Sequence, residues 1–500
     1  MCKTMIAVVA AMAALPIFAE IKMGAPFTDG AVLQRGMKVP VWGKVTPAQS
    51  KVLRKVRVEF AGQEKTAVVG KDGVWRVDLD PMEASKESRT MTVTEARDGF
   101  LWFDDVTDEA EVRDVLVGEV WFASGQSNME CPIWGGSPRY RDGAGALVTS
   151  MDHLPNIRFA KNDRKWSVEP RRADSQGWKK FEPASFTGYT LSAVAYYYAR
   201  ELYLALGGVP VGIVDASWGG TNIDAWTPRC GYEDCDPSIK ATAEWKVTDK
   251  WDDSMKKGPV SGPQQQPTVL FNAMVSSWAP MAMRGFIWYQ GCHNSGEPES
   301  YAAKMHALLN GWSKSFENPD LKLYFVQLAP WNQNWVGLVA AQNKFAAEEP
   351  RAAIAVTADV GNFDDIHPNN KEIVAKRLAI HALKRDYGFD IAEDDSPTFA
   401  SVEFKDGAAV MKFDHATGWY VYAPDRSVEP AFEVAGEDGE WKPAKLQNVD
   451  ENGIVKGSEL VVRSDAVPAP VKVRYLVKPR TMGTVYSQAA LPLGVFETGK

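Results

Sequence analysis

Hydrophobic and polar residues alternate with a period of two near both ends of the chain, as in strands with one buried face. Val56 to Phe60 and Val74 to Leu79 show this alternation, and Lys71-Asp72-Gly73 is a turn signal between strands. The alternation returns after about Phe389, in four runs: Ser401–Phe404, Trp419–Tyr422, Leu460–Arg463 and Val471–Tyr475. The pattern predicts β-sandwich-like modules over residues 20–111 and 391–500.

The middle of the chain has continuous apolar runs that end in polar or glycine-rich loops. These runs are Val115–Phe122, Val211–Asp215, Gly285–Tyr289, Leu323–Leu328 and Ala353–Thr357. Helical patterns lie between them, for example Ala193 to Leu206 and Tyr301 to Ser313. Apolar strands that alternate with helices predict an α/β domain with a doubly wound parallel sheet over residues 112–390. Ligands of such sheets bind outside the carboxyl ends of the strands.

The first 19 residues have the features of a secretory signal peptide. Lys3 supplies a positive start, Ile6 to Leu15 is apolar, and Ala19 is a small residue at which we expect cleavage. The apolar run is too short to span a bilayer. We therefore expect an exported protein, periplasmic or extracellular; the alternative is a buried N-terminal strand.

Composition excludes some partners and leaves others open. The chain has 500 residues, which predicts two or three domains, and a formal net charge of -8 without a basic stripe. Neither nucleic acid nor an anionic membrane surface is expected to bind such a protein. The 18 tryptophans suit sugar rings, although core packing accounts for most of them. Nothing in the sequence indicates the oligomeric state.

Four cysteines remain after cleavage: Cys131, Cys230, Cys235 and Cys292. Export permits disulfides, so Cys230 could pair with Cys235, and Cys131 with Cys292. The alternative is four thiols. The cysteine and histidine spacing has no zinc pattern, and we expect no metal and no organic cofactor.

Ser127 is the candidate nucleophile. It follows the apolar run directly, in Ser124-Gly125-Gln126-Ser127-Asn128, where a strand gives way to a turn. A hydroxyl at that position is presented to the crevice beyond the sheet. The run is not G-x-S-x-G, so the nucleophile elbow of α/β-hydrolases is not the template.

His367 is the candidate general base. It lies in Asn362-Phe363-Asp364-Asp365-Ile366-His367-Pro368, between an apolar strand and a helix that begins near Asn369. An acid in the same short loop can accept from Nδ1 and leave Nε2 facing the serine. Both Asp364 and Asp365 are in range, and Asp365 is preferred. The alternative is a helix N-terminus at which the aspartate caps backbone amides.

An oxyanion needs donors as well. The candidates are the Ser127 N–H, the Gly219-Gly220 turn and one side-chain amide, from Gln290 or Asn294. Gln290 is preferred, because it comes first after its strand.

The motifs together resemble the sialate O-acetylesterases of the SGNH hydrolase superfamily, which are close to carbohydrate esterases that act on acetylated xylan. The resemblance rests on motifs spread over nearly the whole mature chain: Val32-Leu33-Gln34-Arg35, Ser124-Gly125-Gln126-Ser127-Asn128-Met129, Ser217-Trp218-Gly219-Gly220-Thr221, Asp224-Ala225-Trp226, Leu270-Phe271-Asn272-Ala273-Met274, Ile287-Trp288-Tyr289-Gln290-Gly291, Asp365-Ile366-His367-Pro368, Val473-Arg474-Tyr475 and Leu491-Pro492-Leu493.

This resemblance implies a three-layer α/β/α, flavodoxin-like SGNH domain with β modules. It implies hydrolysis of O-acetyl esters on an acetylated carbohydrate, with O-acetylated sialic acid as the expected substrate, Ser127 as nucleophile and His367 as base. Acetylxylan or another glycan is the alternative substrate, and a catalytically inactive carbohydrate-binding protein is the alternative of another class.

Two departures and one open question remain. Cys292-His293-Asn294 stands where the family often has Glu-Ser-Asn, and Asp224 stands where many members have Glu. A site for sialic acid needs donors for its carboxylate. Arg139, Arg141 and Arg164 lie in loops that could supply them.

Overall fold

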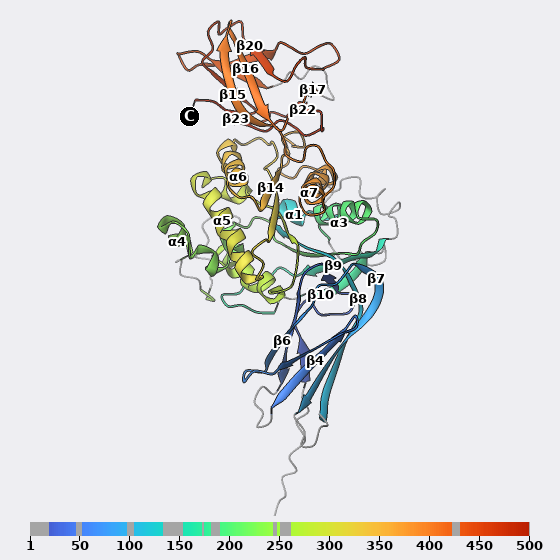
Figure 1. Cartoon of the computed structure of the whole chain (residues 1–500). Helices are drawn as coiled ribbons and strands as arrows, with labels where there is room; N and C mark the ends of the chain where they lie inside the picture. Colours follow the sequence, from blue (N-terminus) through green and yellow to red (C-terminus); the bar gives the residue numbers. More distant parts are fainter. Residues whose placement is uncertain are drawn as a thin grey trace, which may run out of the picture.

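The computed structural model describes residues 20–46, 53–97, 105–133, 154–172, 175–181, 191–243, 248–250, 262–422 and 431–499. Figure 1 shows three parts in a row: N-terminal strands at one end, a mixed central part, and C-terminal strands at the other end. The predicted signal peptide, Arg139 and Arg141 lie outside the described residues. No helix in the described ranges is both long and apolar enough to cross a membrane.

The central part is built on a mostly parallel sheet. Its strand order is β10-β9-β11-β8-β12-β13-β14, and only β10 at the edge runs antiparallel to its neighbour. The strands are β8 (Asp105–Gly125), β9 (Leu154–Asn162), β10 (Ser175–Phe181), β11 (Val211–Ser217), β12 (Gly285–Tyr289), β13 (Lys322–Val326) and β14 (Ala352–Ala355). The five predicted apolar runs match five of these strands: β8, β11, β12, β13 and β14.

Helices cover both faces of the sheet. Successive side chains of a strand point to opposite faces. Phe122 and Trp288 belong to one apolar cluster, with α5 (Pro298–Ser315) and α6 (Val336–Glu348), whereas Trp121 and Tyr289 belong to another, with α3 (Ala193–Ala205) and α7 (Lys371–Arg385). The predicted α/β class is confirmed.

The remaining helices are short: α1 (Ser127–Glu130), α4 (Pro237–Ala243), a π-helical turn (Phe271–Val275), and 3₁₀ turns at Asp224–Trp226, Arg229–Tyr232, Pro263–Gln265, Ser276–Trp278 and Cys292–Asn294.

The N-terminal strands form two groups. β1 (Glu20–Met23), β3 (Val39–Thr46) and β6 (Val74–Leu79) make a three-stranded antiparallel sheet. In the second group, β4 (Arg54–Phe60) lies between β5 (Gln63–Val68) and β7 (Ser85–Arg97), and β7 pairs with the first half of β8. β2 (Val32–Gln34) also pairs with β8. β8 therefore serves both parts, and it runs without a break through the predicted boundary between residues 111 and 112.

The C-terminal strands are antiparallel. Seven of them form a sheet: β15 (Thr398–Lys405), β16 (Ala408–Asp414), β18 (Phe432–Ala435), β19 (Trp441–Leu446), β20 (Leu460–Arg463), β21 (Lys472–Tyr475) and β23 (Phe496–Glu497). A separate pair consists of β17 (Trp419–Val421) and β22 (Val485–Ser487). The residues after Phe389 are thus β-structured, as the alternation predicts.

Candidate active site

Ser127 lies at the carboxyl end of the central strand β8. Gly125 ends the strand with φ +140°, and a Cβ there would come within 2.3 Å of the Tyr289 carbonyl oxygen on β12. The Gln126 N–H donates to that same carbonyl at 3.0 Å, and Ser127 then begins the single-turn helix α1. Glycine is required because the two backbones are so close. The tight turn places the Ser127 side chain beyond the sheet edge.

Ser127, His367 and Asp365 form one chain of hydrogen bonds. Nε2 of His367 lies 2.8 Å from the Ser127 Oγ, and its Nδ1 lies 2.9 Å from Oδ1 of Asp365. The same carboxylate oxygen accepts from the His367 backbone N–H at 3.0 Å. Asp364, whose side chain is 85% exposed, pairs with Arg480 instead. The structure thus brings together the three residues that the sequence nominated for nucleophile, base and orienting acid.

Asn128 and Lys371 join the serine turn to the histidine loop. Nδ2 of Asn128 donates to the Ile366 carbonyl at 3.1 Å, and Nζ of Lys371 donates to Oδ1 of Asn128 at 2.5 Å. Lys371 is 1% exposed, and its Nζ lies 5.3 Å from the centre of the Tyr289 ring. It is the first residue of α7, after Asn370, which caps that helix. Sequence reasoning missed this link, since its signal is spread over two distant motifs.

The pKa of His367 is lowered from its ordinary value. Burial is the main cause, because it disfavours the imidazolium, and the charge of Lys371 acts in the same direction. The Asp365 carboxylate raises the pKa, but not enough to reverse the effect. His367 is therefore neutral at neutral pH, so it can accept a proton from the serine.

The Gly219-Gly220 turn lies against Ser127. A Cβ at Gly219 would meet the Ser127 Cβ at 3.2 Å, so only glycine leaves the serine undisturbed. The Gly219 N–H is already engaged, because it donates to Oε2 of Glu130 at 2.8 Å. The N–H groups of Ser127 and Gly220 have no acceptor within the described parts of the chain. Both are therefore available as backbone donors beside the nucleophile.

Of the two candidate side-chain amides, Asn294 has a donor without an acceptor among the described residues, whereas the preferred Gln290 does not. Nε2 of Gln290 donates to the Thr221 carbonyl at 3.0 Å and to Oδ1 of Asn294 at 2.7 Å, and the side chain is fully buried. Both amide hydrogens of Gln290 therefore serve the fold. Asn294 accepts through Oδ1 from Gln290 and from the Ile223 N–H at 3.1 Å, which orients its amide. Its buried Nδ2 has no acceptor among the described residues.

The four cysteines that remain after the predicted cleavage are free thiols, so neither proposed disulfide is formed. Burial raises the pKa of the Cys292 thiol to about 12, which makes it a poor nucleophile at neutral pH. Beside it, burial lowers the pKa of His293, and the His293 N–H bonds to Oε1 of Gln126 at 3.4 Å. The imidazole of His293 is therefore neutral at neutral pH.

The sequence of residues 117–384 matches the family model described as carbohydrate esterase, sialic acid-specific acetylesterase. The matched region is more than half of the chain. The chain belongs to this family of carboxylic ester hydrolases.

Relatives of the esterase are similar to it over about two thirds or more of its length. The sialate O-acetylesterase of Rattus norvegicus is 28% identical over 65% of this chain and 65% of its own. That of Homo sapiens is 25% identical over 83% of this chain and 80% of its own. The crystal structure of a carbohydrate acetylesterase from Xanthomonas citri has a TM-score of 0.77 and 32% identity, and covers 96% of this chain and 100% of its own. The three-part organisation thus occurs in a solved carbohydrate esterase.

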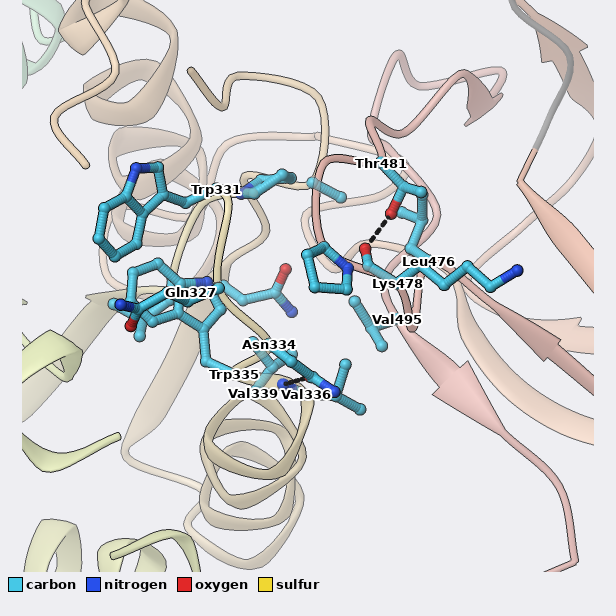
Figure 2. A pocket seen from close by; sticks show the side chains of 15 residues that line it. Gln327, Trp331, Asn334, Trp335, Val336, Val339, Leu476, Lys478, Thr481 and Val495 are labelled. Atoms are coloured by element: carbon cyan, nitrogen blue, oxygen red, sulfur yellow. Dashed lines mark hydrogen bonds between the residues drawn. The ribbon is translucent and has the colours of Figure 1, made fainter. Parts of the chain in front are cut away.

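The loop after β21 borders a crevice on the central part of the esterase. Figure 2 shows Trp331 and Trp335, from the loop after β13, on one side, and Leu476, Lys478 and Thr481 on the other. The two indole rings stack, with centroids 5.2 Å apart. Arg480, in the same C-terminal loop, bonds to the Phe363 carbonyl and to Asp364, which lie just before Asp365.

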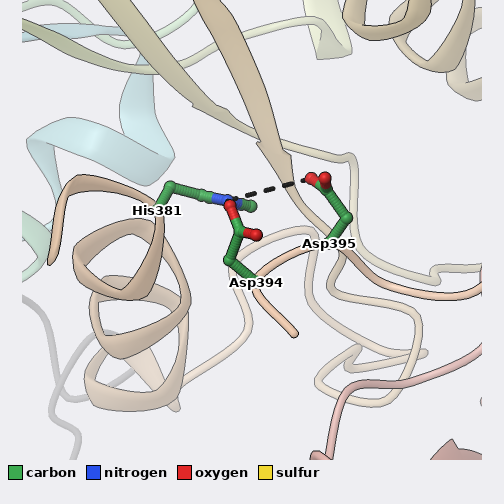
Figure 3. A group of neighbouring side chains, drawn as sticks. All are labelled: His381, Asp394 and Asp395. Atoms are coloured by element: carbon green, nitrogen blue, oxygen red, sulfur yellow. Dashed lines mark hydrogen bonds and ion pairs between the residues drawn. The ribbon is translucent and has the colours of Figure 1, made fainter. Parts of the chain in front are cut away.

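One group of side chains has the spacing of metal ligands within the described residues: His381, Asp394 and Asp395 (Figure 3). Both carboxylates are already neutralised by cations. Arg385 contacts Asp394 and Asp395 at 2.6 Å, and Lys384 contacts Asp394 at 2.9 Å. The group is therefore an ion-pair network that ties α7 to the following segment, since a metal would have to displace both cations.

Arg164 is the one arginine of the three candidates for carboxylate binding that the structure describes. Its Nε pairs with Oε1 of Glu130, and its side chain is 57% exposed. Glu130 itself lies three residues after Ser127. Glu130 was not among the predicted site residues, because its contact with Gly219 joins two motifs that are far apart in the sequence.

Proposed function

We propose that the protein is an exported serine esterase that removes O-acetyl groups from sugars through an acetyl-serine intermediate. The observation that carries the proposal is the continuous hydrogen-bonded chain from Ser127 through His367 to Asp365. A neutral imidazole beside a serine at a strand end is the arrangement that serine hydrolases use. We also assign the central sheet to the SGNH type, on its strand order and on the place of this chain of residues.

In the acylation step the Ser127 Oγ attacks the acetyl carbonyl carbon while its proton passes to Nε2 of His367. Asp365 holds the imidazole and stabilises the cation. The N–H groups of Ser127 and Gly220 and the Asn294 amide donate to the oxyanion. The intermediate collapses, and the sugar oxygen leaves with the proton from His367.

In the deacylation step a water molecule gives a proton to His367 and attacks the acetyl-serine. Acetate leaves, and the proton returns to the Ser127 oxygen. Neither step requires a metal or an organic cofactor. Because acetyl is small, we expect longer acyl esters to be poor substrates.

The first test is hydrolysis of p-nitrophenyl acetate by the wild type and by Ser127→Ala. We expect the variant to lose activity by about 10³-fold or more, since removal of the nucleophile leaves only binding and oxyanion contributions. Equal rates would refute the assignment. Glycan binding without ester turnover in the wild type would favour an inactive carbohydrate-binding protein.

O-acetylated sialic acid is the proposed substrate, because the matching family model is described as a sialic acid-specific acetylesterase. Acetate release from O-acetylated sialic acid and from acetylated xylan, measured side by side, tests this choice. Faster release from xylan would move the substrate to a neutral glycan. Export is tested by the N-terminal sequence of the mature protein, which we expect to begin at Glu20.

A further inference from the structure

Glu130 touches the turn that faces the nucleophile. Helix α1 begins at Ser127 and ends at Glu130, so the two side chains lie on the same helix face. Oε2 of Glu130 accepts from the Gly219 N–H at 2.8 Å, and Gly219 in turn packs directly against Ser127. The carboxylate therefore holds the glycine turn in place beside the seryl oxygen.

A second contact fixes the other side of the same turn. Nε2 of Gln265 donates to the Gly220 carbonyl, and its Oε1 accepts from the Asn222 N–H at 2.9 Å. Gly220 has φ +73°, and its N–H has no acceptor in the described parts of the chain. The turn is thus held at Gly219 and at the Gly220 carbonyl, while the Gly220 N–H stays available for an oxyanion.

The position of Glu130 raises an electrostatic difficulty. A carboxylate this close to Ser127 would oppose the negative charge that develops on the acetyl oxygen, and the opposition is strong where water is excluded. The Glu130 side chain is only 15% exposed. Its second oxygen, however, pairs with Nε of Arg164, so the net charge of this pair is close to zero.

We propose that Glu130 and Arg164 act together as positioning residues of the esterase. Glu130 fixes the Gly219-Gly220 turn against Ser127, and Arg164 neutralises Glu130 so that its charge does not oppose the oxyanion. This role rests on the proposed serine-esterase function. It predicts that Arg164 matters only as long as Glu130 carries a charge.

The test compares four variants on p-nitrophenyl acetate, a neutral ester that offers Arg164 no anionic group to bind. Glu130→Ala removes the acceptor of the Gly219 N–H, and we expect kcat to fall by about 10-fold to 100-fold with little change in KM, less than the loss of an oxyanion donor itself. Glu130→Gln keeps an acceptor oxygen and retains most of the activity. Arg164→Gln leaves the carboxylate unpaired, and kcat falls by about 10-fold.

The double variant E130Q/R164Q gives the decisive result. It removes the unpaired charge, and we expect kcat to recover from the level of Arg164→Gln to that of Glu130→Gln. Arg113→Gln is the matched control, since it breaks an exposed pair with Glu111 in the N-terminal half of β8. Thermal unfolding of every variant shows that the losses of kcat do not come from misfolding.

Two results would overturn the proposal: full activity of Glu130→Ala, or no recovery in E130Q/R164Q. Either can occur while the wild type is active and Ser127→Ala is not, so the esterase assignment would survive. If wild type and Ser127→Ala are equal, the esterase assignment itself fails.

Discussion

His367 lies among groups that push its pKa in opposite directions. Burial and the charge of Lys371 lower the pKa, whereas the Asp365 carboxylate raises it. The result is a pKa below the ordinary value, so the base is neutral at neutral pH. Activity should therefore be lost as the pH falls through this pKa, because a protonated imidazole cannot accept from the serine.

Lys371→Met removes one of the two causes that lower the pKa of His367, the charge of Lys371, and leaves the other, burial. We expect the acidic limb of the kcat/KM profile to move to higher pH, because the imidazolium no longer has a buried cation nearby. The measurement is the pH dependence of p-nitrophenyl acetate hydrolysis. Lys376→Met is the control, since Lys376 lies on the same helix and its side chain is 47% exposed. An unmoved limb in a folded Lys371→Met would contradict the prediction.

Asp365→Asn changes the same base in the other direction. Without the carboxylate the pKa of His367 falls further, so the acidic limb moves to lower pH. We also expect kcat to fall by about 10³-fold or more, since an amide does not hold the productive tautomer. Steady-state kinetics on the same ester measure both effects. Asp364→Asn should lower kcat far less, because Asp364 contacts Arg480 and not His367. Similar losses of kcat in both variants would show that Asp365 is not the orienting acid.

At the scale of elements, the end of β8 depends on one glycine. Gly125 has φ +140°, and a Cβ would lie 2.3 Å from the Tyr289 carbonyl oxygen. Gly125→Ala must therefore move β8 away from β12 or distort the turn before Ser127.

We expect Gly125→Ala to cost about 3 kcal/mol or more, because it combines backbone strain with a clash. Thermal unfolding gives the shift in the midpoint. Gly36→Ala is the matched control: its φ is +68° and nothing lies within 4 Å of the added Cβ, so it should cost only about 1 kcal/mol. Equal shifts in the two variants would show that the close approach to β12 is unimportant.

The sequence predicts elements well where the pattern is local. The apolar runs at Val211, Gly285 and Ala353 are strands, and the helix expected near Asn369 begins at Lys371. Local pattern also places Ser127 at a strand end and His367 in the loop between a strand and a helix. The predicted boundary between residues 111 and 112, in contrast, falls inside the 21-residue strand β8, because the residue pattern changes part-way along a single strand.

Partner choice inside the site is less predictable, because it depends on contacts between distant segments. Gln290 and Asn294 are both amides in one loop, and only the tertiary structure shows that Thr221 and Asn294 use up the donors of Gln290. The Glu130 contact with Gly219 is likewise invisible in either motif alone. Acid and base in one short loop, by contrast, could be paired from sequence.

At the scale of the whole molecule, both β-structured ends contact the central sheet through polar groups. Nε2 of Gln34 donates to the buried Glu119 at 2.9 Å, and its Oε1 accepts from the Val120 N–H at 2.8 Å. At the other end the Gly483 N–H donates to the Ala358 carbonyl at 2.8 Å, close to the loop that carries His367. The segment between β21 and β22 thus contacts the stretch of chain that leads from β14 to the histidine loop.

Arg480 makes the contacts of the C-terminal part that lie nearest to the base. Its backbone N–H donates to the Trp331 carbonyl at 2.8 Å, and its Nη1 donates to the Phe363 carbonyl at 3.3 Å and to Asp364 at 3.1 Å. The guanidinium also lies 5.4 Å from the centre of the Phe363 ring. These bonds support the segment just before Asp365 from outside.

Arg480→Ala should loosen that segment without unfolding the protein, since the side chain is 54% exposed and its ion pair contributes little stability. We expect kcat on p-nitrophenyl acetate to fall by about threefold to tenfold, because small displacements of the base are costly. Arg463→Ala, an exposed arginine of β20 in the same part, is the control and should keep full activity. If Arg480→Ala also keeps full activity, the histidine loop holds its geometry without the C-terminal strands, and their contribution must lie elsewhere than at the base.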